Sequence, residues 1–191
     1  ALMREILQED LLELTVINYK LSDELASHHC EIYLSVEDSR NGEHLSLEGA
    51  GVGLIDAAWH AFQGRFAEEY PSLKSLKFSH FDAKGLINSG HGPNADAEAQ
   101  VDIGITNSYG IEFGFVHKSR SLGHSCVQGV AQAVQYFVNS ELAFVGMYKA
   151  RQHYQAEGRD DLVTKYTALM AKMVKNTSYS TVIDRIRDEI G

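Results

Sequence analysis

The spacing of apolar residues changes twice along this chain, from every second residue to the 3.6-residue period of a helix. Each helical segment follows three segments of alternating pattern, so the order β-β-β-α occurs twice, with equivalent strands roughly 67 residues apart. This order predicts an α+β fold built from two pseudo-symmetric β-β-β-α units, in which antiparallel sheets pack against helices. The feature excludes an all-helical bundle and a parallel doubly wound sheet.

The first unit is predicted over residues 12–70. Alternation begins at Leu14 and resumes in a second strand over residues 30–36. The sequence Asp38-Ser-Arg-Asn-Gly42 is typical of a turn, so residues 43–48 are expected to pair with the second strand as a hairpin. A helix with an apolar stripe follows, at Ile55, Ala58, Trp59, Phe62 and Phe66.

The second unit is predicted over residues 74–140. Its strands are expected around residues 76–81, 95–106 and 111–115, with a turn at Asn107-Ser-Tyr-Gly110. Its helix is expected from about Cys126, with Ser125 at the position where serine often caps a helix. The apolar spacing continues this helix toward Gly158.

Helical patterns alone occupy both ends of the chain. Residues 3–12 predict a short leading helix, and residues 141–191 predict a C-terminal helical extension to the duplicated domain of residues 1–140. Two three-stranded sheets leave edges and faces that need cover, and association with a second copy provides it. We therefore expect a homodimer.

Charge and cysteine usage limit the class of partner and compartment. Lys and Arg number 17 against 26 Asp and Glu, a net charge of −9, so the chain lacks the basic field that binds nucleic acid or anionic membranes. No apolar run approaches the roughly 20 residues that span a bilayer. Cys30 and Cys126 are far apart and outside any Cys-x-x-Cys motif, as expected of a cytoplasmic protein.

The polar residues do not form a recognisable catalytic or metal-binding motif. Nine histidines occur, but without His-x-His or His-Glu-x-x-His spacing, so no metal or other cofactor is expected in this chain. Ser125 and Cys126 are interpreted as residues of a helix start. A small enzyme that uses His91 or His117 in a pocket remains an alternative interpretation.

Three glycines at alternate positions form the most specific motif, Glu48-Gly-Ala-Gly-Val-Gly-Leu-Ile-Asp-Ala-Ala58. Between a strand and a helix, they let the backbone approach a ligand, and the first N–H groups of the helix point at it. The third glycine comes too early for a dinucleotide fingerprint, so a carboxylate is the better ligand. The alternative is that the glycines serve only a tight turn.

At this motif the chain resembles the C-terminal regulatory, or dimerisation, domain of α-isopropylmalate synthases and citramalate synthases. The resemblance covers roughly residues 12–140, and it rests on three pieces: the glycine motif at 49–58, Ala95-Asp-Ala-Glu-Ala-Gln-Val101, and the strand at 113–115 that leads through 119–125 into a helix ending Val138-Asn139. The family fold of two β-β-β-α units in a dimer agrees with the repeat. Two positions depart from the family pattern, Val52 and Leu54, where an Asn and a Pro are usual.

The resemblance implies an effector pocket near the dimer interface for the end-product amino acid of the pathway. Its residues would be Gly51, Gly53, Ile55, Leu76, Ser79, Ala83, Ala97 and Ala99. Leucine is the expected effector, as feedback inhibitor of leucine biosynthesis. Isoleucine, in a citramalate synthase, is the alternative, because one methylene in such a pocket is worth only about 1–3 kcal/mol.

The same resemblance implies a longer parent enzyme. The catalytic TIM barrel, an acetyl-CoA-dependent acyltransferase that holds a divalent metal, would be the domain's partner in the parent chain, and this chain would have no catalytic residues of its own. The first residue is Ala rather than Met, which agrees with a fragment. A free-standing amino-acid-binding module is the alternative from a different class.

Overall fold

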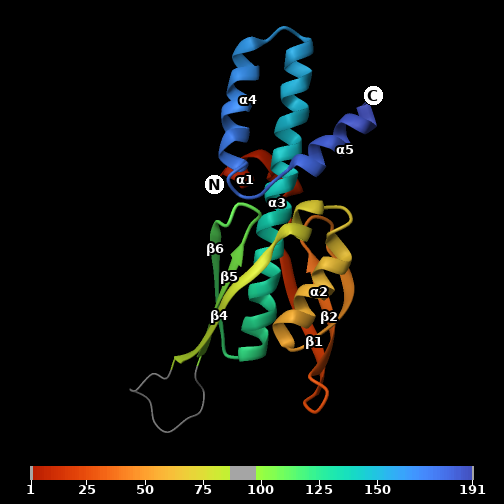
Figure 1. The fold of residues 1–191 in the computed structure, drawn as a ribbon, viewed down its shortest axis with the longest axis vertical. Coiled ribbons are helices and arrows are strands. Elements are labelled where there is room, and N and C mark those ends of the chain that lie inside the picture. Colours follow the sequence, from red (N-terminus) through yellow and green to blue (C-terminus); the bar gives the residue numbers. More distant parts are fainter. Residues whose placement is uncertain (1, 87–97, 191) are drawn as a thin grey trace.

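The computed structural model of the chain describes residues 2–86 and 98–190. The order of elements in its first half follows the predicted periods (Figure 1). A short helix α1 (Leu2–Leu7) and a 3-10 turn η1 (Gln8–Asp10) lead into three strands, β1 (Leu14–Glu24), β2 (His29–Asp38) and β3 (Glu43–Gly51). Helix α2 (Leu54–Phe66) and a second 3-10 helix, η2 (Pro71–Ser75), follow.

The second half repeats this order and then continues as helices. Strands β4 (Lys77–Leu86), β5 (Glu98–Thr106) and β6 (Glu112–Ser119) precede α3 (Leu122–Ala156), a helix of 35 residues. Helices α4 (Asp160–Met173) and α5 (Ser180–Ile190) complete the described chain. The predicted α+β fold with two β-β-β-α units and a C-terminal helical part is confirmed.

Each unit contributes one antiparallel three-stranded sheet, of order β1-β2-β3 or β4-β5-β6. The predicted hairpin of β2 and β3 is present, with Leu34 opposite Leu47. Each unit also has a register shift near the start of its first strand, between Val16 and Asn18 in β1 and between Phe78 and His80 in β4. The two units thus share strand order, pairing and the place of a bulge.

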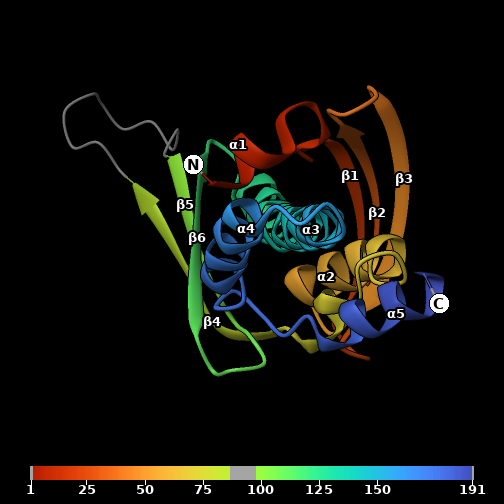
Figure 2. The ribbon, with the colours of Figure 1, turned by 90° about the horizontal axis from the view of Figure 1, so that it is seen from above.

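Helices α2 and α3 lie between the two sheets, so the domain has a helical layer covered on both sides by strands (Figure 2). Both helices begin at the same end of the molecule, beside the hairpin of β1 and β2 (Figure 1). Alternation in the strands explains this layering: in β2, Ile32, Leu34 and Val36 face inward and are buried, while Tyr33 is 52% exposed on the outer face. No element within residues 2–86 and 98–190 covers the outer face of either sheet.

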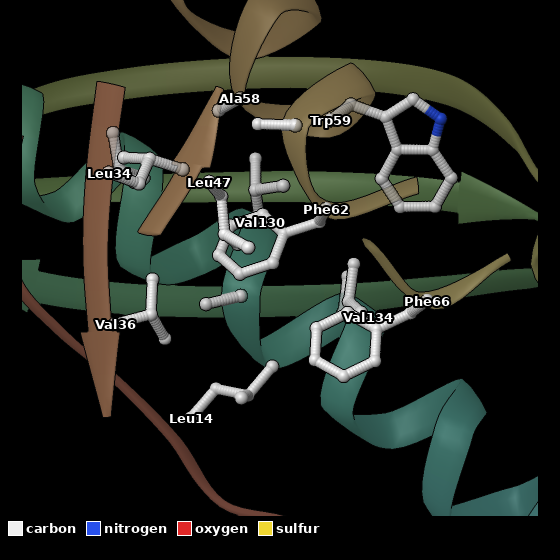
Figure 3. Close-up of a cluster of buried hydrophobic side chains, with 14 of the residues drawn as sticks. Leu14, Leu34, Val36, Leu47, Ala58, Trp59, Phe62, Phe66, Val130 and Val134 are labelled. Carbon is white, nitrogen blue, oxygen red and sulfur yellow. The ribbon is translucent and has the colours of Figure 1, made fainter. Parts of the chain in front are cut away.

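Side chains from every layer meet in one core (Figure 3). Phe62 and Phe66 of α2 lie among residues of the first sheet and of α3, and both are fully buried. Trp59 packs edge-on against Phe78 of β4, with ring centroids 5.2 Å apart, and so joins α2 to the second sheet. Burial of such rings contributes about 1.5–3 kcal/mol each, which makes this core the main stabilising element of the domain.

Amide side chains of α3 bind the free edge of β1 and of the segment before it. Asn139 accepts a hydrogen bond from the Leu12 N–H and donates one to the Leu12 carbonyl, both at 2.8 Å. Gln135 accepts from the Leu14 N–H at 2.9 Å. Gln128 donates to the Leu14 carbonyl, and its own oxygen accepts from the Val16 N–H. The start of this edge, through Val16, is therefore paired by side chains of the chain itself.

The second half of α3 projects beyond the sheets and pairs with α4 as a helical hairpin (Figure 1). The rings of Tyr154 and Tyr166 stack at 5.7 Å, and the Arg151 guanidinium donates to Thr167 at 3.1 Å. The helix runs through residue 140 without interruption, so the duplicated domain and the helical extension share α3.

Hydrogen bonds fasten the segment between α4 and α5 to the domain. The Asn107 side chain donates to the carbonyls of Lys175 and Asn176, and Tyr136 donates to the Asn176 side chain. The Tyr179 ring stacks on Phe144 at 4.3 Å, within a second apolar cluster that includes Val182 and Ile186 of α5. Helix α5 and the segment before it are thus packed against the domain.

The start of α3 differs from the expectation at Cys126. The helix begins four residues earlier, at Leu122, and Ser121 caps it by accepting a hydrogen bond from the His124 N–H at 3.3 Å. The side chain of Ser125 is buried and donates to the Ala99 carbonyl at 3.1 Å, which ties α3 to β5. Several serines precede the helix, and only the tertiary contacts decide which one caps it.

Candidate functional site

The glycine motif forms the connection between β3 and α2, as its spacing predicts. Gly49 and Gly51 face the helix, and side chains there would collide with its backbone: a Cβ on Gly49 would lie 2.5 Å from the Ala61 nitrogen, and one on Gly51 would lie 2.7 Å from the Ala57 nitrogen. Real Cβ contacts are longer, so both glycines are needed for β3 to lie directly on α2.

Gly53 has a different role from the two glycines before it. It is the N-cap residue of α2 with an extended backbone (φ −173°), and a Cβ there would meet no atom within 4 Å. Neither its conformation nor its surroundings require glycine. A Cβ added at Gly53 would lie in open space at the start of α2, whose first N–H groups lack acceptors within the helix.

A carboxylate of the chain itself occupies part of this turn. Asp56, in the first turn of α2, accepts a hydrogen bond from the Val52 N–H at 3.0 Å. His60 lies 3.8 Å from the same carboxylate, and its Nδ1 is 2.7 Å from the Ala50 carbonyl oxygen. The turn therefore already binds one carboxylate, that of Asp56. The carboxylate of a ligand would bind beside Asp56 or displace it.

The spacing of Gly53 and Asp56 in the sequence is a local signal for this arrangement. An acidic residue three positions after an N-cap often reaches back to a backbone N–H, as in a capping box. Asp56 lies three residues after the N-cap residue Gly53. Its carboxylate accepts a hydrogen bond from the N–H of Val52, the residue before Gly53. The glycine motif and its capping carboxylate thus belong together as one local structure.

The eight predicted effector residues are distributed over three places in the single chain. Gly51, Gly53 and Ile55 lie together at the start of α2. Ala99 is at the start of β5, opposite Ser119 of β6. Its carbonyl accepts a hydrogen bond from Ser125 of α3. Ala97 lies outside the described residues.

The remaining three positions lie just before β4 or within it. Leu76 is buried in the core just before the strand begins, Ser79 is at the bulge, and Ala83 is exposed opposite Val101. Extended chain rises about 3.3 Å per residue, so Leu76 and Ala83 are roughly 20 Å apart. The described residues of one chain do not bring the predicted positions into one pocket, and a pocket made of all of them would need a second copy.

The structure adds a polar cluster around Ser79 on the outer face of the second sheet. His80 Nδ1 is 2.9 Å from Glu112 Oε1, and His80 Nε2 is 3.5 Å from Asp102 Oδ1. Ser79 also donates to Glu112. A Cβ on Gly104 would lie 2.5 Å from Ser79 Oγ, so this glycine gives the cluster its room.

Two carboxylates determine the charge state of His80. The hydrogen bond that His80 donates to Glu112 is the main cause of the raised pKa of His80, and Asp102 adds to the effect. Ser79 donates to the carboxylate rather than to the imidazole, so the cluster does not form the serine–histidine pair of a hydrolase. The arrangement joins the three strands and places the imidazole between two carboxylates that favour its protonated form.

The other polar residues considered from the sequence are in structural positions. His117 is half-buried, with Gln132 Nε2 at 3.1 Å from its Nδ1 and the His124 ring edge-on at 5.6 Å. Burial lowers the pKa of His117, and His124 lowers it further. His91 lies outside the described residues, and among those described no group of three or more His, Cys, Asp or Glu is placed to hold a metal ion.

A shallow hollow of about 600 Å³ lies on the outer face of the first sheet. Tyr33 borders it, together with Asn18 and Lys20 of β1 and Ser46 and Glu48 of β3. It is open to solvent and has no convergent set of polar groups. Its importance is as part of an uncovered sheet face.

A scan against protein-family models and a search of curated proteins both found no match to this chain. Within residues 2–86 and 98–190, no helix combines the length and apolar character needed to cross a membrane.

Proposed function

We propose that this chain is the regulatory, amino-acid-binding dimerisation domain of an α-isopropylmalate synthase-like enzyme, with leucine as its feedback inhibitor. Isoleucine is the alternative effector, in a citramalate synthase. In this proposal the catalytic barrel and its divalent metal belong to the rest of the parent enzyme. The domain itself acts by shifting an equilibrium that both the effector site and the barrel feel.

The glycine turn is the observation that carries the proposal. A strand-to-helix connection in which two glycines are required by contact, and a third opens space before a helix N-terminus, suits recognition of a carboxylate. It lies in the first of two β-β-β-α units, as it does in the family that the sequence resembles. A turn needed only for packing would not require Gly53.

Dimerisation is supported by the surface that the fold leaves uncovered. The outer faces carry exposed apolar side chains, among them Ile17 and Tyr33 on the first sheet and Val116 on the second. Side chains of α3 hydrogen-bond only the start of the β1 edge, through Val16, and β3, β4 and β6 are the other outer strands of their sheets. A second copy on these surfaces would bury them.

We further place the domain in the cytoplasm. Cys30 and Cys126 are both free and buried, one on β2 and one on α3. Burial is the largest cause of the raised pKa of each thiol, which keeps the cysteines protonated and unreactive. Two inert thiols are typical of a protein that folds in a reducing compartment.

Calorimetric titration of the chain with leucine, isoleucine and valine tests the proposal. We expect heat and a thermal shift with at least one of the three, and we expect Gly53→Asp to abolish binding at this turn because it places a negative charge where the ligand carboxylate lies. Gly53→Asn is the matched control, since it has the same shape without the charge and the position has room for a side chain. Absence of heat with all three amino acids would overturn effector binding.

A further inference from the structure

A buried carboxylate on α3, that of Glu141, lies close to η2 and to Arg185 of α5. Glu141 is 1% exposed, and its Oε2 accepts a hydrogen bond from the Ser72 N–H at 3.0 Å. Its other oxygen, Oε1, has no hydrogen-bond partner among the residues that the structure describes. An unpaired oxygen on a buried carboxyl group is costly, so this atom lacks a donor that the fold itself does not supply.

Glu141 is one of the residues that line a small cavity of about 180 Å³. Leu142 and Val145 of α3 and the Tyr70 ring form its apolar part, and Arg185 of α5 lies on its other side. The Arg185 Nη2 atom is 3.9 Å from Glu141 Oε1, too far for a hydrogen bond. The cavity thus has one negative and one positive group facing it across a short gap.

The remaining charged group at the cavity is already satisfied. Glu69 accepts a hydrogen bond from the Tyr70 hydroxyl at 2.9 Å and pairs with Arg65 at 3.5 Å. Arg185 uses two of its N–H groups on the Glu69 carbonyl, each at 3.3 Å, and a guanidinium has five. Unused donors on Arg185 and the unused acceptor on Glu141 are therefore the polar groups that a ligand would meet.

We propose that this cavity binds a small α-amino acid, with its ammonium group on Glu141 Oε1, its carboxylate on Arg185 and its apolar side chain against Leu142 and Val145. A zwitterion satisfies both charges at once, whereas a simple anion would repel Glu141 and a simple cation would repel Arg185. The site is separate from the glycine turn and does not depend on the proposed feedback function. Because Arg185 comes from α5, ligand binding would fasten α5 to α3.

The test is calorimetric titration of the full chain with L-valine and L-leucine, and with isobutylamine and isovalerate, which lack the carboxylate and the ammonium respectively. We expect the amino acids to bind, the amine to bind more weakly and isovalerate not to bind. Glu141→Gln should weaken amino-acid binding by at least roughly 30-fold, the loss expected when one member of a buried charge pair is removed. Arg185→Gln should weaken it as well.

Arg187→Gln is the matched control, because Arg187 lies on the same helix but points to solvent, paired with Asp184 at 3.8 Å. It should leave binding unchanged. Gly53→Asp separates the two proposals: it should leave this site intact while removing binding at the glycine turn. Unchanged affinity in Glu141→Gln, or no heat with any amino acid in wild type, would overturn the inference.

Discussion

Asn139 of α3 holds the backbone of Leu12 through both of its polar groups, accepting from the N–H and donating to the carbonyl at 2.8 Å each. The side chain thus acts as an extra strand residue at the edge of the first sheet. Asn139 is 4% exposed and Leu12 is fully buried, so neither group has water as an alternative partner. The contact joins two parts of the chain that are 127 residues apart.

We predict that Asn139→Ala lowers the free energy of unfolding by about 2–4 kcal/mol. It leaves two buried backbone groups of Leu12 without partners, and each costs about 1–3 kcal/mol. Urea denaturation of the two proteins measures the loss. Gln155→Ala is the control: it removes an exposed amide from the same helix, and it should change stability by no more than roughly 0.5 kcal/mol.

Replacement of glycine by alanine should have opposite effects on stability at two positions, Gly51 in the glycine turn and Gly64 in α2. Gly51→Ala should destabilise the domain by about 1–3 kcal/mol, because the new Cβ would lie 2.7 Å from the Ala57 nitrogen. Gly64→Ala, in the exposed part of α2, meets no atom within 4 Å and should stabilise by about 0.5–1 kcal/mol through helix propensity. Thermal or urea unfolding distinguishes the two.

Equal effects at the two positions would contradict the close packing of β3 on α2. The sign at Gly64 shows whether the substitution is tolerated by the helix, and the difference between positions then reports the contact at Gly51 alone. The comparison is independent of ligand binding, so it holds whether or not an effector binds at the turn.

Much of this fold could be predicted from periodicity because local pattern and tertiary burial agree. Val36 and Leu47 alternate with polar neighbours, and Phe62 and Phe66 repeat at helical spacing, so each marks its own element. Tertiary hydrogen bonds were not predictable. Gln128, Gln135 and Asn139 have the composition of a solvated helix face, and only the position of β1 beside α3 gives them acceptors and donors.

The candidate site was predictable to the same extent, and for the same reason. Gly51 and Gly53 are a local signal, because a strand-to-helix turn is short. The grouping of Leu76, Ser79 and Ala83 with them came from the family resemblance, and the single chain spreads these three along β4. Glu141 gave no signal at all, since a glutamate in a long helix is ordinarily exposed.

His80 provides a prediction about pH. Its pKa is raised chiefly by the hydrogen bond that it donates to Glu112, so the folded state binds the proton more tightly than the unfolded state. The stabilising contribution is then fully present below about pH 6.5, the pKa of an unperturbed histidine, and is lost as pH rises through the folded pKa. His80→Gln should therefore cost more stability at pH 5.5 than at pH 8.5.

Proton titration by NMR checks the cause directly. The midpoint of His80 should lie above 6.5 and should fall in Glu112→Gln. His117 is the internal contrast, because burial lowers its pKa and its midpoint should lie below 6.5. If the two histidines titrated together, the pairing of His80 with Glu112 would be contradicted.

Glu141 has a buried carboxyl group. This group affects stability over a pH range in which exposed acids have no effect. Burial is the largest cause of its raised pKa, opposed in part by the Ser72 N–H and by Arg185. The folded state keeps this proton longer than the unfolded state, so its contribution to stability is present below about pH 4.5 and is lost as pH rises through the folded pKa.

Glu141→Gln cannot ionise, and in the absence of ligand the stability of this variant relative to wild type should increase from pH 5 to pH 8. Glu68→Gln removes an exposed carboxylate of the same charge and is the control for net charge. A wild-type protein that gains stability relative to Glu141→Gln over this range would show that Arg185 already neutralises the carboxylate, and the cavity beneath α5 would then have no unpaired charge to offer a ligand.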